Sequence, residues 1–283
     1  MRRAWIYAKA TIDFNKLTLV EKALLESGLE VAVNPTYPIQ SSLPRVTPIE
    51  ALKWADLAIV IGGDGTFLKA FHETRGHIPM LGVNSGDSVG YLMEVLVSQF
   101  EYALQLVLTK NFKIEERLIG FATSGSWNSI FLNEIVITSL HHDKLVQFKV
   151  VVDDDPIIMG RLDGLITATP TGSTAYALSA GGPVIDLTLE AFALVPLAPF
   201  TALAKPIVIS SKKDIRIEAT EKCRLTVDGL DTRALEECSI RISESPTKLK
   251  FIKLPISENT WSRLYRRLVD LPPKLRLKPE HNQ

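Results

Sequence analysis

The sequence predicts an α/β N-terminal domain with a Rossmann-like parallel sheet, followed by a β-rich, sandwich-like C-terminal domain. Two observations support this fold class. Residues 1–98 alternate apolar, strand-like runs with segments of helical spacing, as βαβ units do. Residues 99–260 contain short strand-like runs separated by turns at about ten-residue intervals, which is typical of an antiparallel β domain. The change of pattern predicts a domain boundary after residue 98.

The N-terminal sheet is predicted to have four strands joined by helices and loops. The strands are residues 3–10, 29–34, 57–61 and 79–84, with a helix over residues 13–27 and a proline-rich loop over residues 35–48. The third strand is apolar without alternation, as expected when both faces of a parallel strand are buried. Ligands bind at the carboxyl ends of such strands, so the residues that follow the third and fourth strands are candidates for the site.

The C-terminal domain begins with a helix predicted for residues 98–108. Its predicted strands are residues 129–137, 145–152, 165–168, 206–210, 215–219, 224–227 and 239–243. The acidic run that starts at Asp153 is expected to form a hairpin turn, and Asp228-Gly229 is a turn signal at a strand end. The chain turns helical again from Trp261, and we expect a C-terminal helix within residues 261–283 to pack back on the α/β domain.

The bulk composition excludes several classes of protein. The chain has 283 residues, 46% of them hydrophobic, with 32 basic and 32 acidic residues. Because the formal charge is zero, neither nucleic acid nor an anionic membrane is expected as the main partner. Cys223 and Cys238 are the only cysteines, which gives no disulfide framework and suits a reducing compartment. No apolar stretch reaches transmembrane length, so we expect a soluble, cytoplasmic protein.

The segment GGDGT, residues 62–66, joins the third predicted strand to a helix. Glycines allow positive φ and let another molecule approach the backbone closely, and Thr66 is placed to cap the helix. The free N–H groups and the dipole at a helix start attract phosphate. We therefore predict that Gly63, Gly65 and Thr66 contribute to a nucleotide site.

Asp64 is an acid inside this predicted anion site. A carboxylate repels phosphate unless Mg²⁺ intervenes or the carboxylate handles a hydroxyl proton, and both are roles in phosphoryl transfer. The sequence therefore favours Asp64 as the catalytic residue and Mg²⁺ as the metal, with the metal ligands unassigned. The alternative is a tight strand-to-helix turn in which the aspartate is only a turn former.

Other nucleotide and metal motifs fail on inspection. The chain has no Gly-Lys pair and hence no P-loop, and Leu68 stands where the dinucleotide-binding fingerprint needs its third glycine. His72 and His77 are five residues apart, so their rings diverge around a helix and would not share a zinc ion.

Two further segments suit a ligand rich in oxygen. Residues 170–174, PTGST, lie between a strand and a short helix, so Thr171 and Thr174 offer hydroxyl groups without adding charge. Asn133-Glu134 interrupts an apolar strand, and an amide beside a carboxylate suits ribose hydroxyls. The alternatives are an ordinary Ser/Thr-rich turn and a strand edge exposed to water.

Together these segments resemble the NAD kinase family. The marks of that family are a GGDGT loop, an NE dipeptide early in the β domain and a DGLI…TPTGSTAY.LSAGGP stretch. They stand here at residues 62–66, 133–134 and 163–183, in the family's order. The last stretch is the most specific, because GGDGT alone also resembles the loop of lipid kinases and 6-phosphofructokinases.

The resemblance implies transfer of a phosphoryl group from ATP or polyphosphate to the 2′-hydroxyl of the adenosine ribose of NAD, giving NADP. It implies that Asp64 orients and deprotonates that hydroxyl and that Gly65 lines the same loop. It implies that Asn133 and Glu134 hold the adenine end and the ribose, with Thr174 and Ala175 nearby. It further implies Asp163 near the nicotinamide amide, Tyr176 and Ser179 around the dinucleotide, and Tyr91 near the adenine. It also implies a homodimer or homotetramer.

Two rival functions remain open from the sequence. A lipid or diacylglycerol-type kinase with the same loop would need an apolar groove, and the polar residues 170–174 disfavour one. A non-catalytic NAD(H) sensor would not need Asp64. One departure from the family pattern falls in residues 84–92, which carry one extra residue and Tyr91 in place of the usual Phe.

Overall fold

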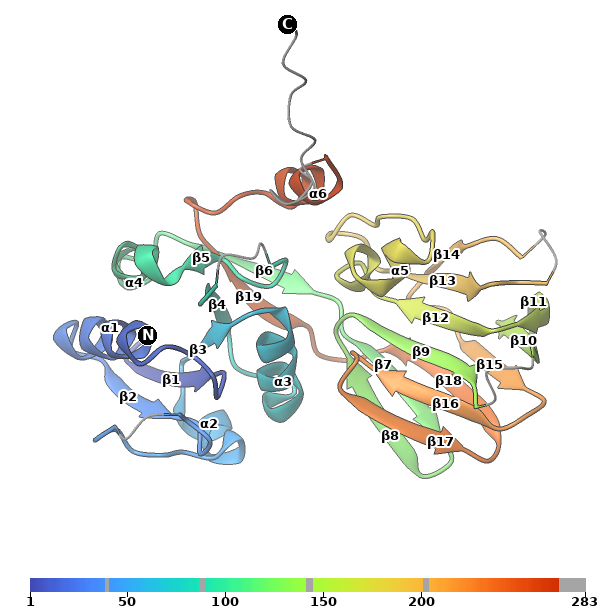
Figure 1. Cartoon of the computed structure of the whole chain (residues 1–283), viewed down its shortest axis with the longest axis horizontal. Coiled ribbons are helices and arrows are strands. Elements are labelled where there is room, and N and C mark those ends of the chain that lie inside the picture. The colour runs from blue at the N-terminus through green and yellow to red at the C-terminus, as the bar shows by residue number, and fades with distance from the viewer. Residues whose placement is uncertain (39–40, 87–89, 141–144, 201–203, 270–283) are drawn as a thin grey trace, which may run out of the picture.

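The computed structural model describes residues 1–38, 41–86, 90–140, 145–200 and 204–269. They form a three-layer α/β part and a β-sandwich, which lie side by side in Figure 1. The predicted fold class is confirmed in both halves. No helix within these ranges is long and apolar enough to cross a membrane.

The sheet of the α/β part is mostly parallel. Its order is β2-β1-β3-β4-β19-β6, with the short β5 beside β4, and β6 runs antiparallel to β19. The strands are β1 (Arg3–Ala8), β2 (Glu30–Val33), β3 (Leu57–Gly62), β4 (Met80–Asn84), β5 (Val95–Leu96), β6 (Lys113–Arg117) and β19 (Leu249–Lys253).

Helices cover both faces of this sheet because successive side chains of a strand point to opposite faces. Ile6 of β1 belongs to the apolar core that contains residues of α1 and α4, and Trp5 belongs to the core on the other face, with residues of α2 and α3 (Figure 1). The helices are α1 (Phe14–Glu26), α2 (Pro48–Trp54), α3 (Asp64–Thr74), η1 (Val97–Gln99) and α4 (Phe100–Leu108).

The β-sandwich consists of two antiparallel sheets with the orders β11-β10-β15-β18-β7-β8 and β14-β13-β12-β9-β16-β17. Their inner faces share one core that includes the fully buried Phe131, Phe148 and Phe192. The strands are β7 (Gly120–Ser124), β8 (Trp127–Phe131), β9 (Glu134–Ser139), β10 (Val146–Val152), β11 (Asp155–Leu162), β12 (Gly164–Ala168), β13 (Ala191–Leu197), β14 (Ile207–Ser210), β15 (Ile215–Ala219), β16 (Cys223–Val227), β17 (Asp231–Leu235) and β18 (Cys238–Glu244).

The α/β sheet extends beyond residues 1–98, the segment predicted for it. Helix α4 packs on the sheet through Phe100 and Leu104, and β6 and β19 are two of its strands. The chain returns to this sheet after the sandwich because β19 pairs with β4 on one side and β6 on the other.

The strand predicted over residues 129–137 is two strands, β8 and β9, in different sheets of the sandwich. The break falls at Leu132 and Asn133, whose N–H groups donate to the side chain of Asp228 and not to a neighbouring strand. The predicted hairpin turn is confirmed, since Asp153 and Asp154 adopt φ angles of 48° and 76° between the paired strands β10 and β11.

The C-terminal helix α6 (Thr260–Val269) lies beside the loop that leads from β4 to β5. The guanidinium of Arg263 donates to the backbone carbonyls of Gly90, Tyr91 and Met93. It also pairs with the fully buried carboxylate of Glu94 at 3.3 Å. Residues 270–283 of the expected C-terminal segment, and residues 87–89 of the stretch that departs from the family pattern, lie outside the described residues.

Candidate active site

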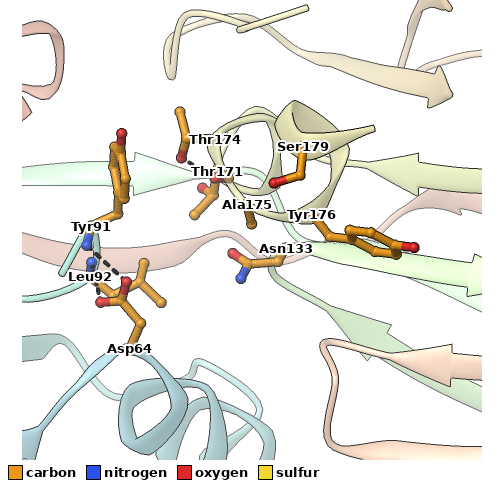
Figure 2. A pocket seen from close by; sticks show the side chains of 9 residues that line it. All are labelled: Asp64, Tyr91, Leu92, Asn133, Thr171, Thr174, Ala175, Tyr176 and Ser179. Atoms are coloured by element: carbon orange, nitrogen blue, oxygen red, sulfur yellow. Dashed lines mark hydrogen bonds between the residues drawn. The ribbon is translucent and has the colours of Figure 1, made fainter. Parts of the chain in front are cut away.

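A pocket of about 320 Å³ lies between the two parts of the molecule (Figure 2). The α/β side supplies the start of α3 and the loop after β4, and the sandwich side supplies the segment before β9 and the loop after β12. The lining residues are Asp64, Tyr91, Leu92, Asn133, Thr171, Thr174, Ala175, Tyr176 and Ser179. All except Leu92 were site candidates from the sequence. The volume suits one nucleoside-sized group.

Asp64 is the first residue of α3, and its carboxylate is held from the loop after β4. One oxygen accepts from the backbone N–H of Tyr91 and the other from that of Leu92, each at 2.9 Å (Figure 2). A carboxylate has about four lone-pair positions, so two remain for a ligand. The loop therefore fixes the orientation of Asp64 and leaves it able to accept a proton.

The GGDGT segment differs from the prediction in two details. Thr66 is not the helix cap, because α3 already begins at Asp64 with Gly63 as its N-cap, and Thr66 is buried in the first turn. The glycines do not adopt positive φ. Gly62 is needed because a Cβ there would lie 2.4 Å from the hydroxyl of Thr66, whereas a Cβ on Gly63 or Gly65 would meet none of the described residues within 4 Å. The open backbone at the start of α3 leaves room for an anionic group.

Asn133 and Glu134 are not at an exposed strand edge. Strand β9 is internal, paired with β12 and β16, and the Glu134 side chain is buried. The Asn133 amide points into the pocket in Figure 2, toward Asp64 on the opposite wall. Glu134 lies next to the pocket wall without lining it. The exposed-edge alternative is therefore wrong for this segment.

The pKa of Glu134 is raised from 4.5 to about 8. Burial is the largest cause and the nearby carboxylate of Asp228 is the second, while the backbone N–H of Tyr176 opposes the rise. Among the described residues the Oε2 atom has no hydrogen-bond partner. At neutral pH Glu134 therefore carries a proton and presents a neutral carboxyl group beside the pocket.

This raised pKa predicts a pH dependence of folding stability. Between pH 4.5 and pH 8 the unfolded chain has lost the Glu134 proton and the folded chain keeps it, so the free energy of unfolding falls as the pH rises. The fall is on the order of 4 kcal/mol across that window. Urea denaturation of the parent and of Glu134→Gln, which cannot titrate, measures it. Equal slopes for the two proteins would show that Glu134 titrates normally.

The loop after β12 uses its hydroxyl groups mainly to hold its own shape. Thr169 Oγ1 donates to the carbonyl of Leu132 at 2.5 Å, Ser173 Oγ donates to Pro170 O at 2.7 Å, and Thr174 Oγ1 donates to Thr171 O at 3.2 Å. Thr171 Oγ1 is buried and has no partner among the described residues. Because a buried hydroxyl without a partner is costly, Thr171 is the hydroxyl of this loop that is best placed to bind a ligand.

Asp163 lies outside the pocket, and the ring of Tyr176 points away from Asp64 (Figure 2). Asp163 is exposed and precedes β12, whereas the pocket lies beyond the opposite end of that strand, so Asp163 does not line it. Tyr176 lines the pocket and is 47% exposed as a whole residue, but its ring points away from Asp64 in Figure 2. Most of the predicted site residues thus line one pocket, and the predicted residues that do not line it are Gly63, Gly65, Thr66, Glu134 and Asp163.

Leu92, His72, Asp228 and Arg263 are residues of the site region that sequence reasoning missed. Leu92 contributes a backbone N–H, which no residue type signals. Arg263 lies about 170 positions from the carbonyls it holds, in a helix whose local pattern is ordinary. Motif spacing does not reveal such long-range contacts.

Two family models match the chain. The ATP-NAD kinase N-terminal domain matches residues 23–112, and the ATP-NAD kinase C-terminal domain matches residues 132–254. The chain is 37% identical to the NAD kinase of Thermococcus kodakarensis over 236 residues, which are 80% of this chain and 84% of that protein. It is 33% identical to the NAD kinase of Methanothermobacter thermautotrophicus over 260 residues, 89% of this chain and 90% of that protein.

Solved structures show the same arrangement. The crystal structure of an NAD kinase from Archaeoglobus fulgidus in complex with ATP superposes with a TM-score of 0.77 at 29% identity, over 93% of this chain and 98% of that chain. Yeast NADH kinase complexed with NADH superposes with a TM-score of 0.85 at 21% identity, over 98% of this chain and 90% of that chain. The yeast likeness concerns the fold.

Proposed function

This chain belongs to the NAD kinase family, and from that premise we propose that its pocket at Asp64 directs a phosphoryl group to the 2′-hydroxyl of the adenosine ribose of NAD. It is an enzyme that phosphorylates NAD to NADP. The assignment of the site rests on one observation: residues from both parts of the molecule line the same pocket. Asp64 stands on the α/β wall and Asn133 on the sandwich wall.

In this proposal Asp64 accepts the proton of the ribose hydroxyl as the new bond forms. Its carboxylate keeps the two backbone hydrogen bonds from Tyr91 and Leu92, which fix its direction, and one of its two remaining lone-pair positions accepts from the hydroxyl. Asn133 and Thr171 hold the ribose and adenine from the other wall. The open start of α3 receives the phosphates of the donor.

Mg²⁺ belongs to the same proposal. No group of three His, Cys, Asp or Glu side chains that could hold a metal is present in the described part of the chain. A magnesium ion is commonly bound by one or two carboxylates together with substrate phosphates, and Asp64 is the carboxylate in the pocket that would serve. When bound, the ion neutralises charge on the transferred phosphoryl group.

The composition of the pocket disfavours a lipid kinase. Its walls carry the Asp64 carboxylate, the Asn133 amide and the hydroxyls of Thr171, Thr174 and Ser179, which suit a sugar and not an acyl chain. A non-catalytic sensor has no use for a carboxylate that two backbone N–H groups hold in the pocket.

The position of the new phosphate tests this function. Incubation of the purified protein with NAD, Mg²⁺ and either ATP or polyphosphate should give NADP, and phosphorus NMR of the product should show a 2′-phosphate. Turnover with each donor, measured side by side, assigns the donor. A 3′-phosphate, a phosphorylated lipid or no product would refute the assignment.

We also propose a cytoplasmic location and a homodimer or homotetramer. The location follows from the two cysteines, which are free and buried in the sandwich and would suit a reducing compartment. The assembly follows from family membership, and light scattering of the purified protein measures it.

A further inference from the structure

Asp228 holds the segment of chain that carries Asn133. One carboxylate oxygen accepts from the backbone N–H of Leu132 at 2.8 Å, and the other accepts from Asn133 at 2.8 Å and Glu134 at 3.0 Å. The Asp228 side chain has no exposed surface. A fully buried carboxylate with several N–H donors is a strong and directional anchor for the backbone around it.

The same carboxylate also reaches the α/β part. Its Oδ2 atom lies 2.8 Å from Nε2 of His72, on helix α3. Asp64 is the first residue of that helix, so His72 lies about 12 Å further along the helix axis. The hydrogen bond therefore links the helix that carries Asp64 to the segment that carries Asn133.

Thr169 holds the other side of this segment. Its hydroxyl donates to Leu132 O at 2.5 Å and its N–H donates to Asn133 O at 2.9 Å, while Asp228 N donates to Glu134 O at 2.9 Å. Every backbone N–H and C=O from Leu132 to Glu134 thus has a partner. With the backbone fixed, the Asn133 side chain is directed into the pocket.

We propose that Asp228 is a positioning residue of this kinase: it sets the direction of the Asn133 amide and, through His72, the separation between that amide and Asp64. Asp228 does not line the pocket, so it acts through the residues that it holds. The inference rests on the proposed function, because it assumes that Asn133 binds NAD.

The local conformation does not by itself explain an aspartate here. Asp228 has a φ of 48°, in the left-handed region, where Asn and Gly are at least as favourable in a turn. Either would avoid burying a charge beside Glu134. The carboxylate is accounted for by the four donors that surround it, since no neutral side chain of this size accepts from all of them.

Asp228→Asn is the test. The amide keeps one acceptor oxygen, and its NH₂ group must face at least one buried backbone N–H that then has no acceptor. We expect the KM for NAD to rise by about 10- to 100-fold, the range that one buried unpaired donor brings, with the KM for ATP within about twofold of the parent. A purely structural role would lower the active fraction, and hence kcat, at unchanged KM.

Asp153→Asn is a matched control. Asp153 also has a φ of 48°, and its carboxylate also accepts a backbone N–H, that of Asp214 at 3.0 Å. It lies in the hairpin between β10 and β11, outside the pocket. This variant removes the same charge from the same backbone conformation and should keep the parent values of both KM and kcat.

His72 provides the second arm. His72→Ala removes the link to α3 and should raise the KM for NAD about 3- to 10-fold, whereas His72→Gln, whose amide can still donate to Asp228, should restore most of it. The double variant with Asp228→Asn should lose less than the sum of the two single variants, because the two residues share one contact. If Asp228→Asn fails to fold, the KM values of the two His72 variants for NAD test the proposal on their own.

The pH profile separates positioning from a general loss of structure. The groups that act on Glu134 are the nearby carboxylate of Asp228, which is itself 2.8 Å from His72, and the backbone N–H of Tyr176. Removal of the negative charge should lower the pH at which NAD affinity changes with Glu134 ionisation. Calorimetry reads this affinity without turnover, so the result stands even if phosphoryl transfer itself is refuted. Parent-like KM and NAD affinity in Asp228→Asn and His72→Ala would overturn the inference.

Discussion

Asp64→Asn should bind NAD about as tightly as the parent and lose roughly 10²–10⁴ in turnover, the usual scale for a lost general base. A carboxylate is a far weaker base than a ribose alkoxide, so it cannot remove the proton in advance. It accepts the proton as the bond to phosphorus forms. The side chain therefore acts in the transition state more than in the ground state.

The hydrogen bonds of Asp64 require that NAD affinity be measured together with turnover. Each oxygen of Asp64 accepts a backbone N–H, one from Tyr91 and one from Leu92, and an asparagine keeps only one acceptor. A shift of the loop after β4 would appear as weaker NAD binding, so calorimetric affinity must be measured beside turnover at saturating Mg²⁺.

Asp13→Asn is a suitable control for Asp64→Asn. Asp13 also lies at the start of a helix in the α/β part, where its carboxylate accepts the N–H of Asn15 at 2.7 Å. Asparagine caps helices as well as aspartate does, so this variant should match the parent. Near-normal turnover in Asp64→Asn would remove Asp64 from the mechanism and leave the GGDGT loop as a phosphate cradle.

The buried strands were predictable because they are continuous apolar runs. Residues 57–61 and 165–168 lie within β3 and β12, which are buried on both faces. The edge strands β6, KIEER, and β17, DTRAL, were missed because most of their side chains are polar and partly or fully exposed. Pro156 in β11 and Pro196 in β13 also count against a strand in any sequence-based prediction.

The pocket was predictable where a short motif contains the chemistry. Asn133 is a polar residue in an apolar, strand-like run, and Thr171 belongs to a hydroxyl-rich loop between a strand and a helix, so the sequence marks both. His72 and Asp228 were not predictable as a pair, because each has an ordinary local explanation and 156 positions separate them. Only the folded chain brings the helix and the turn together, so short sequence motifs do not reveal the residues that position the site.

The close approach of the loop after β12 to Asn133 predicts a second large effect. A Cβ on Gly172 would lie 2.0 Å from the carbonyl oxygen of Asn133 and 2.4 Å from its carbonyl carbon. Both partners are backbone, so no side-chain rotation relieves the clash. Gly172→Ala must push the loop and the Asn133 segment apart, which strains the hydrogen bond from Thr169 N to Asn133 O.

Asn133 and Thr171 line the same pocket, so a displacement of about 1 Å between them should lower kcat/KM for NAD by about 10²-fold. The strain of the added methyl group should also lower the free energy of unfolding by about 1–3 kcal/mol. Gly160→Ala, in β11 of the same sandwich, is the matched control, since a Cβ there meets no atom of the described part of the chain within 4 Å. Steady-state kinetics and denaturant unfolding measure both effects. Since alanine at 172 adds one methyl group and changes no charge, parent-like kinetics and stability would mean that the loop and Asn133 do not approach as closely as this pocket requires.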